Sequence, residues 1–267
     1  MYSLAFIGAG RMATAIAAGL VSKEVFAPEK MIAFDPVISA GENFTATSKV
    51  KCVSSLEELN FNEIDAILIA VKPQVIKSAL TPIANLLKDK LVISIAAGVP
   101  INVLSSIIGH QKIVRVMPNT PALVGMGATA FSAGEGATTE DLQLVEKIFA
   151  SVGIATCVKE ADLDAVTGLS GSGPAYVFEF IKALADGGVA EGLTRAAALE
   201  LAVQTVLGSA QMVKETQLHP AVLCDQVTSP GGTTSRGLEQ LAQNAFAGTV
   251  IKAVRAASER SRQLGKM

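Results

Sequence analysis

The stretch that decides the fold is residues 4–13, LAFIGAGRMA. An apolar segment typical of a β-strand leads directly into a glycine-rich turn and then into a predicted helix over 14–21. Gly8 allows a tight turn, Gly10 lets the backbone approach a pyrophosphate, and Ala13 permits close contact between helix and strand. Because the N–H groups at a helix start attract anions, we expect a dinucleotide to bind here. The alternative is a tight turn without a ligand.

Short apolar segments alternate with longer helical ones as far as about Gly153, a pattern typical of βαβ units in a parallel sheet. Their continuous apolarity indicates that helices cover both faces of the sheet. The predicted strands are 4–7, 31–34, 66–70, 91–95 and 113–116. A further segment, 128–131, is expected to extend the same sheet before a helix over 140–152.

After Glu160 the β-branched runs disappear, and stretches rich in Ala, Leu, Glu, Lys and Gln follow a period of 3.6 residues. We therefore predict an α/β domain over residues 1–160 and an all-α domain over residues 161–267. The expected helices are 174–190, 194–215 with Thr194 as N-cap, 220–227, 233–244 and 248–264. The second of them is apolar nearly all round, so either a homodimer interface or a thick monomer core must cover it.

Composition narrows the classes of function. The 267 residues are 50% hydrophobic and 17% charged, enough to build one large core or two modest ones. The formal charge is −2 and no basic run occurs, which argues against a nucleic-acid binder and favours small-molecule chemistry. The three cysteines and two histidines lack metal-ligand spacing, so no metal site is predicted.

The expected compartment is the cytoplasm, because an odd, sparse cysteine count fits a reducing environment. Two apolar stretches, 1–20 and 91–111, are interrupted by glycine and by charged or polar residues. We interpret both as strand, loop and helix rather than as a signal segment or a membrane span.

Asp35 follows the second predicted strand, a little over twenty residues beyond the glycine turn. A carboxylate there accepts hydrogen bonds from an adenine-ribose hydroxyl and repels a 2′-phosphate, which favours NADH. Arg11 pulls the other way, because a guanidinium at the mouth of the loop can hold a phosphate. The alternative role for Asp35 is a turn residue before Pro36.

Three further segments follow predicted strands, at the edge where open α/β sheets bind ligands: 71–73, 96–99 and 117–121. Small residues such as Ala97 and Gly98 would let a nicotinamide ring lie against the backbone. The amide of Asn119 is a candidate hydrogen-bond partner for a ribose or carboxamide. Lys72 is either a cofactor contact or a solvated lysine.

The helical half carries two clusters of glycine and serine, 167–176 and 227–234. In the second cluster a Gly-Gly turn delivers backbone N–H groups and the hydroxyls of Thr233 and Thr234 to a helix start. Such a site can receive the carboxylate of an anionic small substrate. The alternative is an ordinary loop in which Thr233 is the N-cap.

Over essentially its whole length the chain resembles the pyrroline-5-carboxylate reductase family. The motifs that carry the resemblance are FIGAG with Met12-Ala13, AVKP at 70–73, AAG at 96–98, NTP at 119–121, DAVTGLSGSGPAY at 164–176 and SPGGTT at 229–234. The resemblance implies a Rossmann-like N-terminal domain with a parallel-type sheet and an all-α C-terminal dimerisation domain. It also implies an active site between one subunit's cofactor domain and helical elements of the dimer.

The resemblance implies two sets of site residues by matching position. The predicted dinucleotide contacts are Ile7, Gly8, Ala9, Gly10, Arg11, Met12, Asp35, Ala70, Val71, Lys72, Pro73, Ala97, Gly98 and Gln226, to which the strand-end argument adds Asn119. The predicted substrate contacts are Glu160, Ser229, Gly231, Gly232, Thr233 and Thr234. Within them Thr234 is the predicted catalytic residue, because its hydroxyl can exchange a hydrogen bond with the substrate nitrogen.

The implied reaction is reduction of 1-pyrroline-5-carboxylate to L-proline with NADH or NADPH, the last step of proline biosynthesis. Asp35 favours a modest preference for NADH. One alternative is a β-hydroxyacid dehydrogenase or a related imine reductase, although the catalytic-lysine motif of the former is not visible. The other is a dinucleotide-sensing dimer without catalysis, which gives no reason for the SPGGTT loop.

Overall fold

The computed structural model describes residues 3–265 and divides into two compact units. We call Met1–Ser172 together with Ala256–Met267 the sheet unit, and Gly173–Arg255 the helical unit. The domain boundary predicted at residue 160 follows the change in sequence pattern, whereas the compact units divide after Ser172. Residues 1–2 and 266–267 of the predicted domains lie outside the described range.

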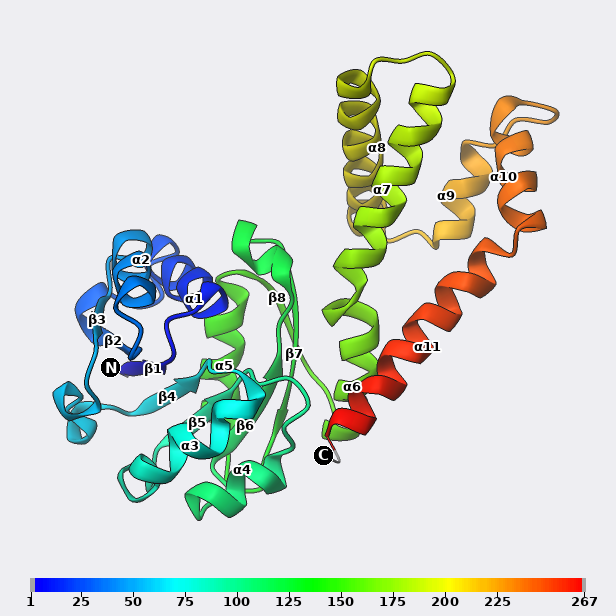
Figure 1. Ribbon diagram of the computed structural model, residues 1–267. Helices are drawn as coiled ribbons and strands as arrows, with labels where there is room; N and C mark the ends of the chain where they lie inside the picture. The colour runs from blue at the N-terminus through cyan, green and yellow to red at the C-terminus, as the bar shows by residue number, and fades with distance from the viewer. Residues whose placement is uncertain (1–2, 266–267) are drawn as a thin grey trace. The chain divides into compact units, whose positions relative to one another are not determined.

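The sheet unit contains an eight-stranded sheet in the order β3-β2-β1-β4-β5-β6-β7-β8 (Figure 1). Its strands are β1 (Leu4–Ile7), β2 (Met31–Phe34), β3 (Lys51–Val53), β4 (Ala66–Ile69), β5 (Leu91–Ser94), β6 (Ile113–Met117), β7 (Gly127–Ala133) and β8 (Gly153–Cys157). All neighbouring strands are parallel except the pair β6 and β7. The strand order reverses between β1 and β4, and ligands of open α/β sheets bind at such a switch point.

All six predicted strands are confirmed, and the chain has two more. β3 has only three residues and begins with an exposed lysine, and β8 starts with glycine and is mostly exposed. Both are edge strands, so neither carries the continuous apolar run by which the inner strands were recognised.

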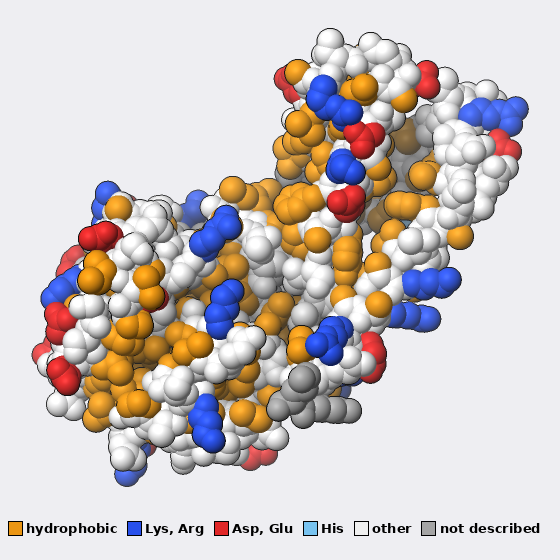
Figure 2. Space-filling model, viewed as in Figure 1, with side chains coloured by type: hydrophobic (Ala, Val, Ile, Leu, Met, Phe, Trp, Pro, Cys, Tyr) orange, Lys and Arg blue, Asp and Glu red, His pale blue; other side chains and the backbone are white. Residues whose placement is uncertain are grey.

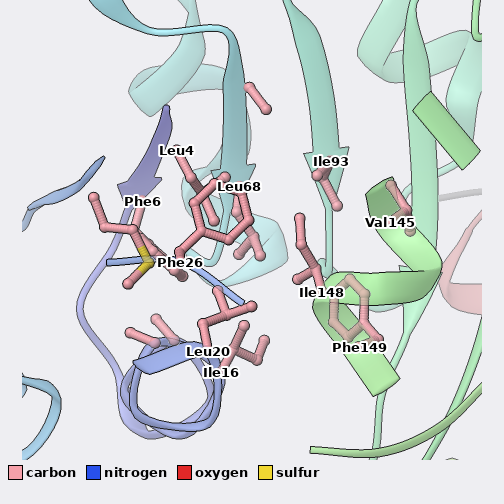
Figure 3. Close-up of a cluster of buried hydrophobic side chains, with 14 of the residues drawn as sticks. Leu4, Phe6, Ile16, Leu20, Phe26, Leu68, Ile93, Val145, Ile148 and Phe149 are labelled. Atoms are coloured by element: carbon pink, nitrogen blue, oxygen red, sulfur yellow. The ribbon is translucent and has the colours of Figure 1, made fainter. Parts of the chain in front are cut away.

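Helices cover both faces of the sheet, as the apolar strands predicted. On one face lie α1 (Arg11–Ser22), α2 (Ile38–Ser48) and α5 (Thr139–Ala150); on the other lie α3 (Ile76–Leu80) and α4 (Ile101–Ile108). Alternate residues of one strand therefore enter different cores: Leu68 packs with the α1 side, and Ile67 and Ile69 pack with the other. Figure 3 shows the first core, where side chains from α1 and α5 meet the sheet.

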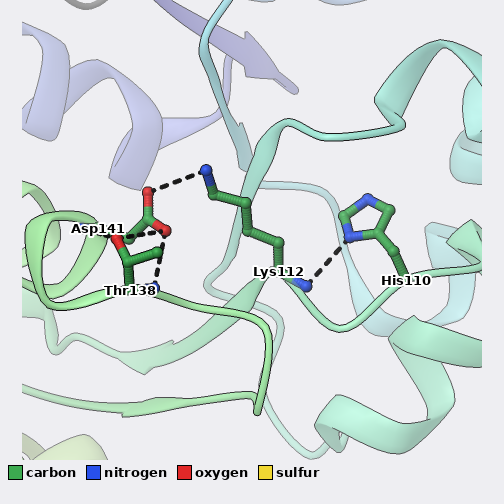
Figure 4. A network of polar contacts seen from close by, with 4 residues as sticks. All are labelled: His110, Lys112, Thr138 and Asp141. Atoms are coloured by element: carbon green, nitrogen blue, oxygen red, sulfur yellow. Dashed lines mark hydrogen bonds and ion pairs between the residues drawn. The ribbon is translucent and has the colours of Figure 1, made fainter.

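A polar network joins the segment before β6 to the start of α5 (Figure 4). Lys112 Nζ lies 3.4 Å from Asp141 Oδ1, and the Asp141 side chain is only 2% exposed. Asp141 and Thr138 also form a reciprocal capping box at the start of α5. His110 Nδ1 accepts a hydrogen bond from the Lys112 N–H at 3.1 Å. This network ties two elements of the sheet unit together.

All five helices predicted in the C-terminal half are present. They are α7 (Gly173–Ala190), α8 (Arg195–Thr216), α9 (Pro220–Gln226), α10 (Thr233–Gln243) and α11 (Phe246–Leu264). Thr194 is confirmed as the N-cap of α8, since its hydroxyl accepts a hydrogen bond from Ala197 N at 3.3 Å. Before α7, a short α6 (Leu163–Val166) leads into a π-helical turn over Thr167–Gly171, both within the sheet unit.

The apolar surface of α8 is largely uncovered. Within the helical unit the helix packs beside α7 and buries only Ala198 and Ala202. Its large exposed apolar side chains are Leu199, Leu201, Val203, Leu207 and Met212. Hydrophobic side chains accordingly appear on the surface of this unit in Figure 2. Among residues 3–265, α8 is the one helix whose length and composition would suffice to cross a membrane. No thick monomer core covers α8, so the interface interpretation of this helix remains.

Candidate active site

The glycine turn after β1 opens α1 with several unused hydrogen-bond donors. Gly10 is the N-cap in an extended conformation, with φ −71° and ψ 176°, and therefore has no side chain that could cap the helix. Thr14 N is the first amide to bond back, to Gly10 O at 2.9 Å. Among the described residues nothing accepts from the N–H groups of residues 10–13, and no acidic residue lies in the first turn. This end of α1 is therefore an open anion site.

Glycine stands at the two positions of this turn, 8 and 10, for different physical reasons. Gly8 has φ +102°, and a Cβ there would lie 2.9 Å from Ala70 O, so the fold itself requires glycine. Gly10 has ordinary backbone angles, and a Cβ there would meet nothing within 4 Å. The backbone and the packing at position 10 therefore do not require glycine, and the space beside this residue is empty.

The structure brings Asp35 to the same turn. Asp35 Oδ2 accepts a hydrogen bond from Ala9 N at 2.8 Å, and Oδ1 accepts from Val37 N at 2.9 Å. Asp35 is therefore a turn residue before Pro36, as one alternative predicted, and a neighbour of the glycine loop. Its contact with an adenine ribose stays a prediction. Arg11 is exposed and has no ion-pair partner within the described part of the chain.

A pocket of about 560 Å³ opens beside Asp35, between α2 and β3. Its lining includes Ile38, Thr45 and Cys52. Burial, and secondarily the nearby Asp35 charge, raise the pKa of the Cys52 thiol. This thiol is therefore a packing group rather than a reactive thiolate.

The segments after β4 and β5 lie at the same edge of the sheet as the glycine turn, because β1, β4 and β5 are parallel. Ala70 N donates to Ile7 O at 2.8 Å, which fixes the 70–73 segment beside the turn. Lys72 is exposed and caps the short 3₁₀ turn Pro73–Val75 with its backbone only. After β5, Ala97 is exposed and Gly98 has φ +74°. The predicted cofactor contacts of the sheet unit thus gather along one edge.

Asn119 is held in place by the protein itself. Its Oδ1 accepts from Ala128 N at 2.8 Å, and its Nδ2 donates to Ser170 O at 3.0 Å. The residue is only 7% exposed. The side chain therefore joins the end of β6 to the start of β7 and to the π-helical turn, and its predicted contact with the cofactor stays a prediction.

Glu160 also has partners within the sheet unit. Its Oε1 accepts from Ile101 N, the first residue of α4, at 2.7 Å, and lies 3.3 Å from Arg115 Nη1. The Glu160 side chain is 35% exposed, and Oε2 has no partner among residues 3–265. One carboxylate oxygen is thus committed to the protein and the other is available to a ligand.

In the helical unit, the 229–234 loop starts α10 in the same manner as the glycine turn starts α1. Gly232 is the N-cap, with φ −77° and ψ 177°, and no side chain caps the helix. Thr233 is the first helical residue, so the alternative that made Thr233 the N-cap is wrong. Thr234 is half-buried, and its hydroxyl has no partner within the described range. Gln226 ends α9 with an exposed side chain.

Two family descriptions match separate parts of the chain: "NADP oxidoreductase coenzyme F420-dependent" over residues 3–98 and "Pyrroline-5-carboxylate reductase dimerisation" over residues 160–264. A pyrroline-5-carboxylate reductase from Arabidopsis thaliana is 47% identical over 267 residues, covering 99% of this chain and 96% of the relative. The chain belongs to the pyrroline-5-carboxylate reductase family. A relative from Synechocystis is 46% identical, with 98% of each chain covered.

Solved structures of pyrroline-5-carboxylate reductases share the fold. The Plasmodium falciparum enzyme, solved with NADP bound, has a TM-score of 0.88 and 39% identity, covering 99% of this chain and 98% of the other. The Coxiella burnetii enzyme has a TM-score of 0.91 and 34% identity, with 98% of each chain covered. A prephenate dehydrogenase from Aquifex aeolicus, at 12% identity and a TM-score of 0.56, shares the fold alone.

Sequence reasoning missed three residues of the sheet unit that make long-range polar contacts, two of them with predicted site residues. Arg115 binds Glu160, Ser170 lends its carbonyl to Asn119, and Asp164 Oδ1 accepts from Ser261 Oγ at 2.6 Å. Arg115 left a signal, because it is the one charged residue in the otherwise apolar strand β6. The other contacts join residues more than fifty positions apart and left none.

Proposed function

We propose that this protein catalyses the NAD(P)H-dependent reduction of 1-pyrroline-5-carboxylate to L-proline, the final step of proline biosynthesis. The observation that carries the proposal is the uncapped start of α10 with Thr234 in its first turn, in a chain of this family. A helix start without a capping side chain suits the carboxylate of a small imino acid. The half-buried hydroxyl suits its nitrogen.

The residues of the sheet unit fit a dinucleotide. The free amides at the start of α1 and the open space at Gly10 suit a pyrophosphate, and Asp35 suits the adenine ribose. Ala70–Pro73 and Ala97–Gly98 would hold the rest of the molecule at the same sheet edge, and Gln226 would be a further contact. When bound, the reduced nicotinamide supplies the hydride that the electrophilic imine carbon accepts.

The chain's own residues bind and orient the imine. The backbone N–H groups at the start of α10 and the Ser229 hydroxyl would hold the carboxylate, and Glu160 would be a further substrate contact through its unpaired Oε2 atom. The Thr234 hydroxyl would hold the ring nitrogen, donating to the imine and accepting from the protonated imine and the product amine. As the new C–H bond forms, the π electrons of the C=N bond become the lone pair of nitrogen. The proton on nitrogen would come from solvent through the Thr234 hydroxyl, which takes up one proton as it gives another. No histidine or cysteine is needed for this chemistry.

A modest preference for NADH is part of the proposal. The Asp35 carboxylate is fixed in place by two backbone amides, so its negative charge cannot swing away from a 2′-phosphate. Exposed Arg11 is a flexible counter-charge with no fixed position. The Plasmodium falciparum relative was solved with NADP bound, so the proposed preference for NADH can be compared directly with that enzyme.

We also infer a homodimer and a cytoplasmic location. The exposed apolar face of α8 lies within the segment that matches the dimerisation family, so a second copy of the chain would cover it. The cysteines of the described range are all free, which fits a reducing compartment. We infer neither a nucleic-acid nor a membrane partner.

A direct assay tests the reaction. The purified protein is incubated with 1-pyrroline-5-carboxylate and either NADH or NADPH, and cofactor oxidation is followed together with proline formation. We expect stoichiometric proline with both cofactors and a higher kcat/KM with NADH. Absence of proline with both cofactors would refute the proposed function. Turnover of a hydroxyacid instead would favour the dehydrogenase alternative, and tight cofactor binding without any turnover would favour the sensor.

A further inference from the structure

Arg115 is a charged side chain in an unusual place. It lies in the middle of β6, between the apolar residues Val114 and Val116, and its side chain is 9% exposed. Burying a guanidinium is unfavourable unless it is paired, and the ion pair that the structure gives it is with Glu160. A charge maintained in such a position needs a reason beyond stability, because an apolar residue would pack there at lower cost.

The Glu160 carboxylate oxygen that faces Arg115 has a second duty. The same Oε1 accepts the Ile101 N–H at 2.7 Å, so it lies at the positive end of α4. Glu160 Oε1 is thus held between Arg115 in strand β6 and the first N–H group of helix α4. The direction of the remaining oxygen, Oε2, is fixed as a consequence.

Ile101 closes the loop that follows β5, which contains the predicted nicotinamide contacts Ala97 and Gly98. Further contacts hold this loop: Ala96 N donates to Ser94 Oγ at 3.4 Å, and Ser94 is the register neighbour of Arg115. At Gly98, a Cβ would lie 3.6 Å from Leu264 Cβ. The loop is thus anchored at both ends and backed by the last turn of α11.

We propose that Arg115 is a positioning residue: through one oxygen of Glu160 it orients this predicted substrate contact and also holds the loop that would support the nicotinamide. The inference rests on the proposed function and adds to it a residue that touches neither ligand. Removing Arg115 would leave Glu160 free to turn and α4 free to shift. Because reactions between two bound partners are sensitive to displacements of about 1 Å, both ligands should respond.

A double-mutant cycle on kcat/KM tests the route through Glu160. Lysine at position 115 keeps the charge but lacks the planar guanidinium. We expect Arg115→Lys to lower kcat/KM for the imine roughly tenfold in the otherwise native chain, and less than about twofold in a Glu160→Ala background. Equal losses in both backgrounds, or no loss from Arg115→Lys, would overturn the proposal.

A matched control lies just before the same strand. Lys112 pairs with the buried Asp141, and among the described residues no hydrogen bond or ion pair joins it to the 96–101 loop or to Glu160. Lys112→Met should lower the melting temperature while leaving kcat/KM and cofactor affinity within about twofold of the native enzyme. If Lys112→Met and Arg115→Lys change the kinetics alike, the effect of Arg115 is general destabilisation and the proposal fails.

Cofactor affinity, measured by nicotinamide fluorescence without any imine, separates this inference from the proposed function. It also remains informative if the Arg115 variants do not fold. Because Glu160 anchors Ile101, Glu160→Ala should weaken NADH binding roughly fivefold besides raising the KM for the imine. An unchanged NADH affinity would make Glu160 a substrate contact only and would overturn the proposal. A native chain that binds NADH but forms no proline would instead refute the proposed function.

Discussion

Two helix starts in this protein, α1 in the sheet unit and α10 in the helical unit, share one construction. Each has a glycine N-cap in an extended conformation, no capping side chain and no acidic residue in the first turn. Each is preceded by a glycine with positive φ, Gly8 at +102° and Gly231 at +68°. Both therefore present free N–H groups to an anion.

The two starts differ in what surrounds them. The turn before α1 is held by the sheet, since Gly8 lies against Ala70 and Asp35 binds Ala9 N. The turn before α10 is closed by its own short loop, with Gly232 N donating to Ser229 O at 3.0 Å. The threonines also differ: Thr14 in the first turn of α1 donates its hydroxyl to Gly10 O at 3.1 Å, whereas the Thr234 hydroxyl at the start of α10 has no partner within the described range. The comparison teaches that the same backbone arrangement at a helix start can be held by a sheet in one place and by a short local loop in the other.

The largest expected effect comes from filling the open space at Gly10. Gly10→Val should lower the binding affinity for NADH and for NADPH by about 10³-fold, because two charge-assisted hydrogen bonds to phosphate would be lost. Folding should be preserved, because a Cβ at this position meets nothing within 4 Å. Cofactor titration with circular dichroism as a folding control measures both. Native cofactor affinity in this variant would show that the start of α1 is not the phosphate site.

Next in size is the hydroxyl at the start of α10. Thr234→Ala should lower kcat/KM by roughly 10²-fold, the scale of a positioned proton-exchanging group, with cofactor affinity unchanged. Thr233→Ala is the matched control, and should act less strongly and mainly on the KM for the imine. Steady-state kinetics of both variants measure kcat/KM and the KM for the imine. If Thr234→Ala retained native kcat/KM, the proton would have to come from water or from another residue.

A smaller effect is expected where Asp35 meets the first turn. Asp35→Ser should shift the ratio of kcat/KM for NADH over NADPH toward NADPH by roughly tenfold, about 1.4 kcal/mol. The variant removes the charge but retains an oxygen that can accept from Ala9 N. Parallel assays with the two cofactors measure the shift. A native enzyme that strongly prefers NADPH would mean that Arg11 outweighs Asp35.

The smallest expected effect is on stability, and it distinguishes the backbone conformations of the two glycine turns. Gly231→Ala should lower the free energy of unfolding by about 1 kcal/mol, because its φ of +68° disfavours any side chain. Gly10→Ala, at φ −71°, should leave that free energy within about 0.5 kcal/mol of the native value. Denaturant titration of the two variants provides the measurement. Equal losses would remove the distinction between a glycine that the fold needs and one that the ligand needs.

Much of the fold and of the candidate site was predictable because its signals are local. Strand β1, the glycine turn and the start of α1 lie within a few residues of one another, and apolar runs mark the inner strands whatever their neighbours are. The helices of the C-terminal half follow from periodicity, and Thr194 was recognisable as a cap. The edge strands β3 and β8 were not predictable, because an edge strand buries too little to need a continuous apolar run.

By itself, the sequence determined the family, the dinucleotide turn and the threonine-bearing loop, because each depends on short-range backbone chemistry carried by contiguous residues. Only the tertiary structure decided which side chains are committed to the protein: Asn119 to Ala128 and Ser170, and one oxygen of Glu160 to Ile101 and Arg115. Those partners are separated by up to 59 positions in the chain. A hydrogen bond depends on distance and angle in space, and no local pattern encodes a distance between residues that only folding brings together.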